Sequence, residues 1–350
     1  MLDERYEIVE LFGEGSVGLV YRAVDLHLAR PVAVKILREE TAHGEILERF
    51  FREARVLSRL AHPNVISVAD FGLAPPPGAA GKARQGDDGT PYLVMELLEG
   101  RVLEEEVDRG ALGVGRSLAI ARQLLSALAY AHDQGVVHRD LKAGNLWLTD
   151  SIGRPDHLKV LDFGLARIVD PNDDPGQAGF TRRGFVYGSP EYLSPEQAAG
   201  DVADARSDLY SAGVVLFEML TGRLPFVDTD PNIVMQRHML AAPPRVREMP
   251  GGADVPEEVE AIVTRALRKG RADRWQNARE FLAAVEDAEA RFAPPPVRSS
   301  APPPAPVPPV PVLPPPQVAP LVHSSRAWWW LAGLVGAAAA VAAVVASSLI

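Results

Sequence analysis

The 350-residue sequence contains no cysteine, and this absence excludes a whole set of chemistries. Without a thiol there is no disulfide, no thiol redox reaction, no catalytic cysteine and no cysteine-ligated metal. The eight histidines are scattered and form no H-x-x-x-H pair, so the sequence gives no support for a helical zinc site. Internal repeats are also missing, which argues against a solenoid or an array of repeated units.

Positive charge is scarce as well. The sequence has 36 basic and 46 acidic side chains, and residues 293–350 hold two arginines but no acid, so residues 1–292 carry a net charge of −12. Non-specific binding of nucleic acid requires a basic surface, so nucleic acid is not an expected partner. Hydrophobic residues make up 47% of the chain, which is enough to fill a core and excludes wholesale disorder.

The composition changes abruptly at Ala293, where 14 of the next 28 residues are proline. Such a stretch cannot pack a core, and we predict a disordered Pro-rich linker over 293–325, extended by about 3 Å per residue. Its P-x-x-P matches leave a second interpretation, a ligand for SH3-like or WW-like modules.

We expect no secretory signal at the start of the sequence, because charged residues are spread through the first twenty positions.

The last 23 residues, 328–350, are uncharged and exceed the roughly 20 that span a bilayer as a helix. Arg326 lies just before this stretch, and three tryptophans, 328–330, begin it, as at a membrane interface. We therefore predict one transmembrane helix over 326–350, with the domain before it cytoplasmic. The alternative is a buried or aggregation-prone tail. Small residues four apart, such as Gly333 and Ala337, permit close helix pairing and hence a homodimer.

The strand and helix patterns in residues 1–292 predict one folded domain of the α+β class with two lobes. Strand patterning begins at Tyr6, Gly18, Pro31, Val65 and Tyr92 and is interrupted by one helix with apolar residues from Phe50 to Ala61. From about residue 103 helices dominate, and Ser117–Ala131 and Asp208–Leu220 are apolar on more than one face. We expect a β-rich lobe over about 1–96 and a mostly helical lobe over about 97–292.

The run Gly13-Glu-Gly15-Ser-Val-Gly18 matches G-x-G-x-x-G, which is a weak signal on its own. A dinucleotide-binding turn requires a helix directly after the glycines, whereas a β-rich run follows here. This context favours a hairpin whose backbone N–H groups lie over phosphates. Glycine is needed there because a side chain would keep the phosphates away from the backbone.

Lys35 lies in the apolar strand Val32-Ala-Val-Lys35, where burying an ammonium is costly without an anionic partner. The candidate partners are the phosphates of a nucleotide and the carboxylate of Glu53, which shares a helix face with Leu57. The alternative is a surface lysine and a solvated glutamate.

The second lobe contains His138-Arg-Asp140-Leu-Lys142-Ala-Gly-Asn145, followed later by Asp162-Phe-Gly after an apolar strand. Asp140 can accept a hydrogen bond from an incoming hydroxyl, and Lys142 can place positive charge beside a transferring phosphoryl group. Asn145 and Asp162 offer the oxygen ligands that Mg²⁺ prefers. Either motif alone could be ordinary loop sequence, but the two in this order indicate phosphoryl transfer.

Taken together, these motifs resemble those of the eukaryotic-like (Hanks-type) protein kinases, and in particular bacterial Ser/Thr kinases with a membrane anchor. The resemblance covers about residues 4–290 and implies the bilobal kinase fold, with ATP and Mg²⁺ as cofactors and proteins as substrates. It implies Asp140 as catalytic base with Lys142 beside it, Lys35 on the phosphates and paired with Glu53, and Asn145 and Asp162 as metal ligands. The nucleotide-binding residues that it implies are Gly13, Glu14, Gly15, Ser16, Gly18, Val20, Ala33, Lys35, the gatekeeper Met95, and Glu96 and Leu98 of the hinge.

Further positions match structural and regulatory parts of the family. Gly188-Ser-Pro-Glu-Tyr192 resembles the substrate-docking stretch, Asp208 the buried organiser of the catalytic loop, and Glu196 and Arg274 a buried ion pair. Ala143 replaces the usual proline, and Ser194-Pro-Glu replaces A-P-E. Thr181 is the first hydroxyl after Asp162, and we expect its phosphate to be captured by Arg139, which neighbours the catalytic base. The alternative is an ordinary loop threonine, with Arg139 paired elsewhere.

Three classes of function compete. The first is an active Ser/Thr protein kinase with regulatory autophosphorylation, acting in signalling at a membrane. The second is a pseudokinase scaffold, which would normally have lost Lys35, Asp140 or Asp162. The third is a small-molecule phosphotransferase, against which the docking stretch argues.

Overall fold

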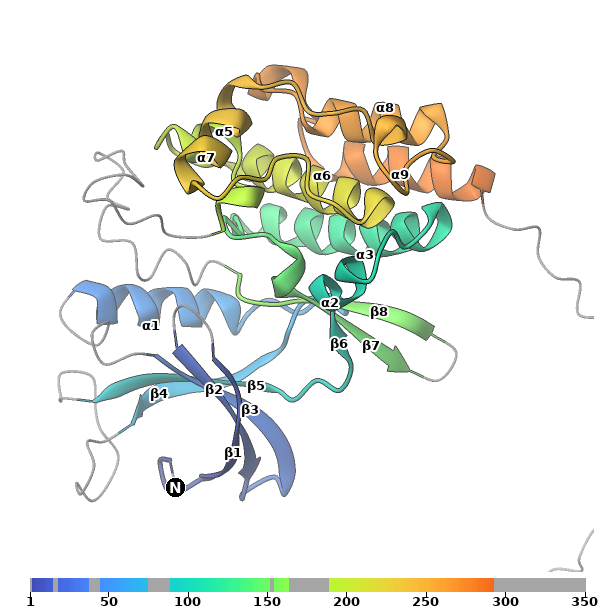
Figure 1. Ribbon diagram of the computed structural model, residues 1–350. Coiled ribbons are helices and arrows are strands. Elements are labelled where there is room, and N and C mark those ends of the chain that lie inside the picture. The colour runs from blue at the N-terminus through green and yellow to red at the C-terminus, as the bar shows by residue number, and fades with distance from the viewer. Residues whose placement is uncertain are drawn as a thin grey trace, which may run out of the picture. The chain divides into compact units, whose positions relative to one another are not determined.

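A computed structural model describes residues 2–14, 18–37, 45–74, 89–151, 154–163 and 189–292 (Figure 1). Two lobes make up this part of the chain. The first holds a five-stranded antiparallel sheet in the order β1-β2-β3-β5-β4. Its elements are β1 (Tyr6–Glu14), β2 (Gly18–Asp25), β3 (Arg30–Leu37), α1 (Glu45–Leu57), β4 (Val68–Ala74) and β5 (Thr90–Glu96).

The second lobe is mostly helical. A small sheet in the order β6-β7-β8 lies next to it, and α3 packs against α6 and α9 (Figure 1). The strands are β6 (Arg101–Val102), β7 (Leu146–Ser151) and β8 (Arg154–Val160). The α-helices are α2 (Leu103–Asp108), α3 (Val114–Asp133), α5 (Pro195–Ala198), α6 (Ala205–Thr221), α7 (Pro231–Leu240), α8 (Glu257–Ala266) and α9 (Ala278–Phe292).

Helix α6 forms the centre of this lobe, and its sequence sets both of its ends. Asp204 caps the first turn by accepting from the backbone of Arg206, and Ser207 completes a capping box. Gly222 ends the helix in the left-handed region at φ 67°, which a side chain would strain. Because α6 is apolar on nearly all faces, it is buried from Ser207 to Thr221.

Two predicted elements differ from those observed. The strand expected from Val65 begins at Val68, because Val65 instead forms an isolated parallel bridge with Val160 and so joins the two sheets. The helix expected to reach Ala61 ends at Leu57, shortly before Pro63. In the described part of the chain, no helix combines the length and the apolar character needed to cross a bilayer. The predicted linker and transmembrane helix, 293–350, lie outside the described residues.

Candidate active site

The hairpin of β1 and β2 forms one wall of the site. Gly13 pairs with Val20, and nothing lies within 4 Å of where a side chain on Gly13 would begin. Gly18 is different, because a β-carbon there would lie 2.2 Å from the Ile36 carbonyl oxygen of β3. Gly18 is therefore required by close strand packing, whereas the sequence suggested a phosphate approach alone. Gly15 and Ser16 lie outside the described residues.

Lys35 is buried in β3 and its ammonium is paired with a carboxylate from the other lobe. Nζ donates to both carboxylate oxygens of Asp162, at 2.7 and 2.8 Å. Only 6% of the Lys35 side chain is exposed, so this pair answers the expected need for an anionic partner. The predicted pairing of Lys35 with Glu53 stays a prediction, because the Glu53 side chain lies outside the described residues although its backbone lies in α1.

At the predicted hinge, the backbone N–H and the carboxylate of Glu96 already form hydrogen bonds within the protein. The backbone N–H of Glu96 donates to the Ser67 carbonyl at 3.1 Å, and the Glu96 carboxylate accepts from Lys159 Nζ at 2.8 Å. Of the other predicted residues, Ala33 pairs with Met95 across β3 and β5, and both are buried. Hydrogen bonds to a base at the hinge therefore depend on backbone groups other than the N–H of Glu96.

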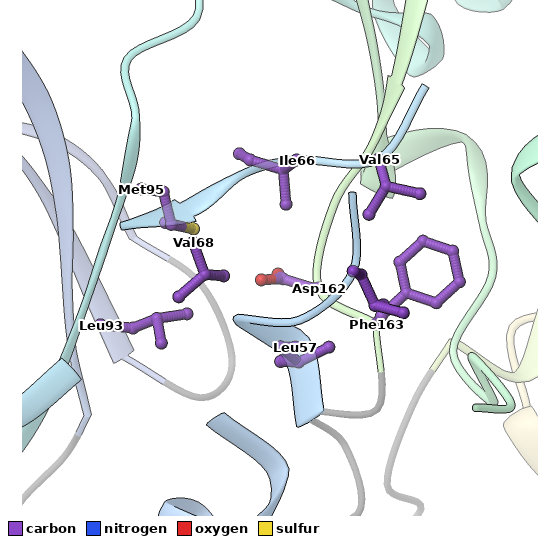
Figure 2. A pocket seen from close by; sticks show the side chains of 9 residues that line it. Leu57, Val65, Ile66, Val68, Leu93, Met95, Asp162 and Phe163 are labelled. Carbon is purple, nitrogen blue, oxygen red and sulfur yellow. The ribbon is translucent and has the colours of Figure 1, made fainter. Parts of the chain in front are cut away.

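Behind Met95 lies an apolar pocket between the two lobes (Figure 2). Figure 2 shows the Asp162 carboxylate extending among apolar side chains, with the Phe163 ring turned away from Met95. The lining residues are Leu57, Leu60, Val65, Ile66, Val68, Leu93, Met95, Asp162 and Phe163. This pocket places Asp162 at the boundary between the two lobes, where it reaches Lys35.

The predicted catalytic groups come together on the loop that precedes β7. The Asn145 side-chain amide donates to the Asp140 carbonyl at 2.7 Å and faces its carboxylate at 3.3 Å. Lys142 Nζ lies 3.6 Å from the Asp140 carboxylate and donates to Ser189 Oγ at 3.0 Å. Base, cation and amide therefore form one cluster, and Ser189 connects the cluster to the docking stretch.

Asp208 holds the backbone of this loop, as the sequence predicted. Its carboxylate accepts from the backbone N–H groups of His138 and Arg139, each at 2.8 Å, and contacts His132 Nε2 at 2.8 Å. Burial opposes the charged form, but these hydrogen bonds outweigh it and hold the pKa of Asp208 below its ordinary value. Arg139 adopts φ 68°, a left-handed conformation that a non-glycine residue keeps only when its surroundings enforce it.

His138 links the catalytic loop to the segment that carries Asp162. Its Nε2 donates to the Leu161 carbonyl at 2.9 Å, and its ring packs on Phe163 with centroids 4.7 Å apart. Asp162 follows with φ 55°, a second left-handed residue in the same cluster. The sequence placed His138 in a motif but gave it no role. The only available signal was its position two residues before Asp140.

A buried ion pair that matches the prediction follows the docking stretch, four residues after Tyr192. Arg274 donates to both oxygens of Glu196, at 2.8 and 2.7 Å, and is 0% exposed. Ser207 Oγ also donates to Glu196 at 2.6 Å. Despite burial, the bonds from Arg274 and Ser207 keep the pKa of Glu196 below its ordinary value. The backbone leading to Glu196 is thereby fixed against α6.

Comparison with known proteins decides the family. A family model described as protein kinase domain matches residues 6–284. The chain belongs to the protein kinase family. It is 42% identical over 301 residues to the serine/threonine-protein kinase pkn3 of Myxococcus xanthus, covering 85% of this chain and 52% of that protein. It is 38% identical over 300 residues to the serine/threonine-protein kinase PknB of Mycolicibacterium smegmatis, covering 84% and 45%.

A solved structure supports the same conclusion. The kinase domain of Mycobacterium tuberculosis PknI superposes with a TM-score of 0.61 at 26% identity, covering 82% of this chain and 97% of that domain. The chain spans about half the length, or less, of the curated relatives it matches. The motifs that suggested the family therefore lie in a domain with the same bilobal arrangement.

Sequence reasoning missed a buried carboxyl beneath the docking stretch. Glu218 on α6 accepts from the Tyr192 hydroxyl at 2.7 Å, directly beneath the docking stretch. Burial raises the pKa of Glu218 to about 7, and the carboxylates of Glu104 and Asp108 add to the rise. A glutamate inside an apolar helix was the only signal in the sequence.

This carboxyl makes stability depend on pH. The pKa of Glu218 is higher in the folded than in the unfolded chain, so its favourable contribution is complete below about pH 4.5 and is lost as the pH rises through about 7. We expect Glu218→Gln to raise the free energy of unfolding by about 2–3 kcal/mol more at pH 8 than at pH 5. Urea titrations at both pH values measure this difference, with exposed Glu258→Gln as control. Equal effects at both pH values would contradict the assignment.

Proposed function

We propose that the chain is a serine/threonine kinase that transfers a phosphoryl group from ATP to hydroxyls on proteins, in a signalling role. The observation that carries the proposal is the contact of Lys142 with both Asp140 and Ser189. It connects the base and the cation expected for phosphoryl transfer to the stretch that matches the family's site for a protein acceptor. The names of the relatives, all serine/threonine-protein kinases, support the same reaction.

The side chains are suited to distinct tasks. Asp140 would orient the acceptor hydroxyl and accept its proton, while Lys142 would stabilise negative charge on the transferring group. The Asn145 amide nitrogen is committed to Asp140, so its oxygen is the atom left to bind a cation. That oxygen and the Asp162 carboxylate are hard donors that fit Mg²⁺, which would neutralise charge on the phosphates of ATP. When ATP binds, the Lys35 ammonium would leave the Asp162 carboxylate and bind phosphate oxygens instead.

Labelled ATP with Mg²⁺ tests the reaction against its alternatives. Label recovered on serine or threonine of an added protein, or of the chain itself, would support the proposal. Label on a small molecule from a cell extract, with none on protein, would favour a small-molecule phosphotransferase. Binding of ATP with no transfer to any acceptor would favour a scaffold that has lost activity.

We further propose that residues 326–350 anchor the protein in a membrane, with 293–325 as a spacer and the kinase domain cytoplasmic. Deleting residues 321–350 should move the protein from the membrane pellet to the soluble fraction, because this removes the whole uncharged stretch of 23 residues. Activity on an added protein should persist, since the spacer separates the two parts. Fractionation of lysates measures the shift, and the intact chain in the soluble fraction would argue against the anchor.

Thr181, which lies outside the described residues, is the proposed site of regulatory autophosphorylation between molecules. Its phosphate would add close to two negative charges, and Arg139 offers a guanidinium beside Asp140 to bind them. Confinement to a membrane would raise the local concentration of the reacting copies, with or without a stable homodimer. Thr181→Ala should lower activity on added substrate roughly tenfold or more. The exposed Thr229→Ala is the control, and a fully active preparation with unmodified Thr181 by mass spectrometry would refute this mechanism.

A further inference from the structure

His238 is a fully buried histidine on α7 whose ring contacts the backbone of the docking stretch. It is 0% exposed, and both ring nitrogens have partners. Nε2 lies 2.9 Å from the Glu191 carbonyl oxygen, and Nδ1 lies 2.9 Å from the Tyr210 hydroxyl of α6. The ring packs edge-on against Phe226, with centroids 5.0 Å apart. A polar side chain this deeply buried is expected to have a specific task.

The partners fix the direction of each hydrogen bond. The Glu191 carbonyl can only accept, so Nε2 carries the proton. Burial, with a smaller effect of the Lys269 cation, lowers the pKa of His238 to about 4, so the ring is neutral near pH 7 and Nδ1 accepts from Tyr210. Lys269 Nζ, 3.3 Å from the Tyr210 oxygen, donates to it in turn. The result is a directed chain of bonds from Lys269 through Tyr210 and His238 to a backbone carbonyl.

That carbonyl belongs to the short 3-10 helix Pro190–Tyr192, which starts directly after Ser189. Ser189 accepts from Lys142, as described above, so only Pro190 separates the residue bonded to His238 from the residue bonded to Lys142. On the other side, Ser211 Oγ donates to the Tyr192 carbonyl at 2.8 Å. The docking stretch is therefore held at successive carbonyls by α7 and α6, while its first hydroxyl contacts the catalytic lysine.

We propose that His238 is a positioning residue for the acceptor protein, which it serves by fixing the Glu191 carbonyl and with it the docking stretch next to Lys142. This inference rests on the proposed transfer to proteins. The chain of hydrogen bonds ends on the acceptor side of Asp140, whereas Lys35 and the hinge lie on the nucleotide side. Its loss should therefore weaken use of the acceptor and leave ATP binding intact.

The full-length protein tests this with casein as a generic acceptor. His238→Leu should raise the KM for casein roughly tenfold, as expected when the Glu191 carbonyl loses the N–H that His238 donates to it. His238→Gln, whose amide can reach the same carbonyl, should recover most of the loss. Tyr210→Phe removes the donor that fixes the tautomer and should change the KM in the same direction. The affinity for a non-hydrolysable ATP analogue with Mg²⁺ should be the same in all three variants.

Phe226→Leu is the matched control, because it removes packing from the same ring without touching the hydrogen bonds. It should lower the melting temperature yet leave the KM for casein unchanged. The proposal is overturned if folded His238→Leu keeps the wild-type KM, if ATP affinity falls in parallel, or if Phe226→Leu reproduces the defect. A wild-type protein that binds ATP but phosphorylates neither casein nor itself would instead overturn the proposed function.

Discussion

Replacing Asp140 with asparagine should lower kcat for phosphoryl transfer at least about 100-fold, while the affinity for ATP with Mg²⁺ stays near that of the wild type. Asparagine cannot accept the proton of the acceptor hydroxyl, but it preserves the size of the side chain. The bond from Asn145 to the Asp140 backbone carbonyl does not involve the replaced group, so the loop should keep its shape. Single-turnover transfer to a protein and direct nucleotide titration measure the two quantities separately.

The exposed Asp254 provides the matched control, because Asp254→Asn makes the same chemical change away from the loop. This variant should retain wild-type kcat. Near wild-type turnover in Asp140→Asn would contradict the kinase assignment, and a parallel loss of ATP binding would indicate damage to the fold instead.

Replacing Arg274 with methionine should have the largest effect on stability, a loss of about 3–5 kcal/mol in the free energy of unfolding. The change removes the cation that binds both oxygens of Glu196, whose side chain is only 4% exposed, and leaves it the longer contact with Arg271 Nε at 3.7 Å. Arg274 also donates to the backbone carbonyls of Arg206, Arg268 and Lys269, so three further hydrogen bonds are lost. Thermal unfolding of the full chain should shift downward by on the order of 10 °C.

A double variant separates charge from packing. Combining Glu196→Gln with Arg274→Met removes both charges, so the double variant should be more stable than Arg274→Met alone. If the double variant were less stable than the wild type by the full sum of the two single effects, the two side chains would not be coupled and the predicted cause would be wrong.

Short-range motifs allowed the clustering of the candidate catalytic groups to be predicted from sequence. Asp140, Lys142 and Asn145 lie within six residues of one another, so a single loop brings them together regardless of the rest of the fold. The match of Asp208 with the buried organiser also held, because the family resemblance supplied the contact that sequence distance hides. In the structure it bonds to His138 and Arg139 seventy residues away.

Contacts between segments that lie far apart in the sequence could not be derived. Lys35 and Asp162 are 127 residues apart, and no periodicity in either strand indicates that they meet. The same limit applies to Tyr192 and Glu218, which pair only because the docking stretch folds onto α6. The approach of Gly18 to phosphates stays a prediction, and the close contact that excludes a side chain there comes from a neighbouring strand whose register the sequence does not specify.

The pairing of Lys35 with both oxygens of Asp162 has a consequence for nucleotide affinity. A ligand that needs these two groups can bind only the fraction of molecules in which the pair has opened. The measured dissociation constant is then the intrinsic constant divided by that fraction. Any anionic group that draws Lys35 away from Asp162 would tighten nucleotide binding without touching the nucleotide, by enlarging the competent population before the ligand arrives.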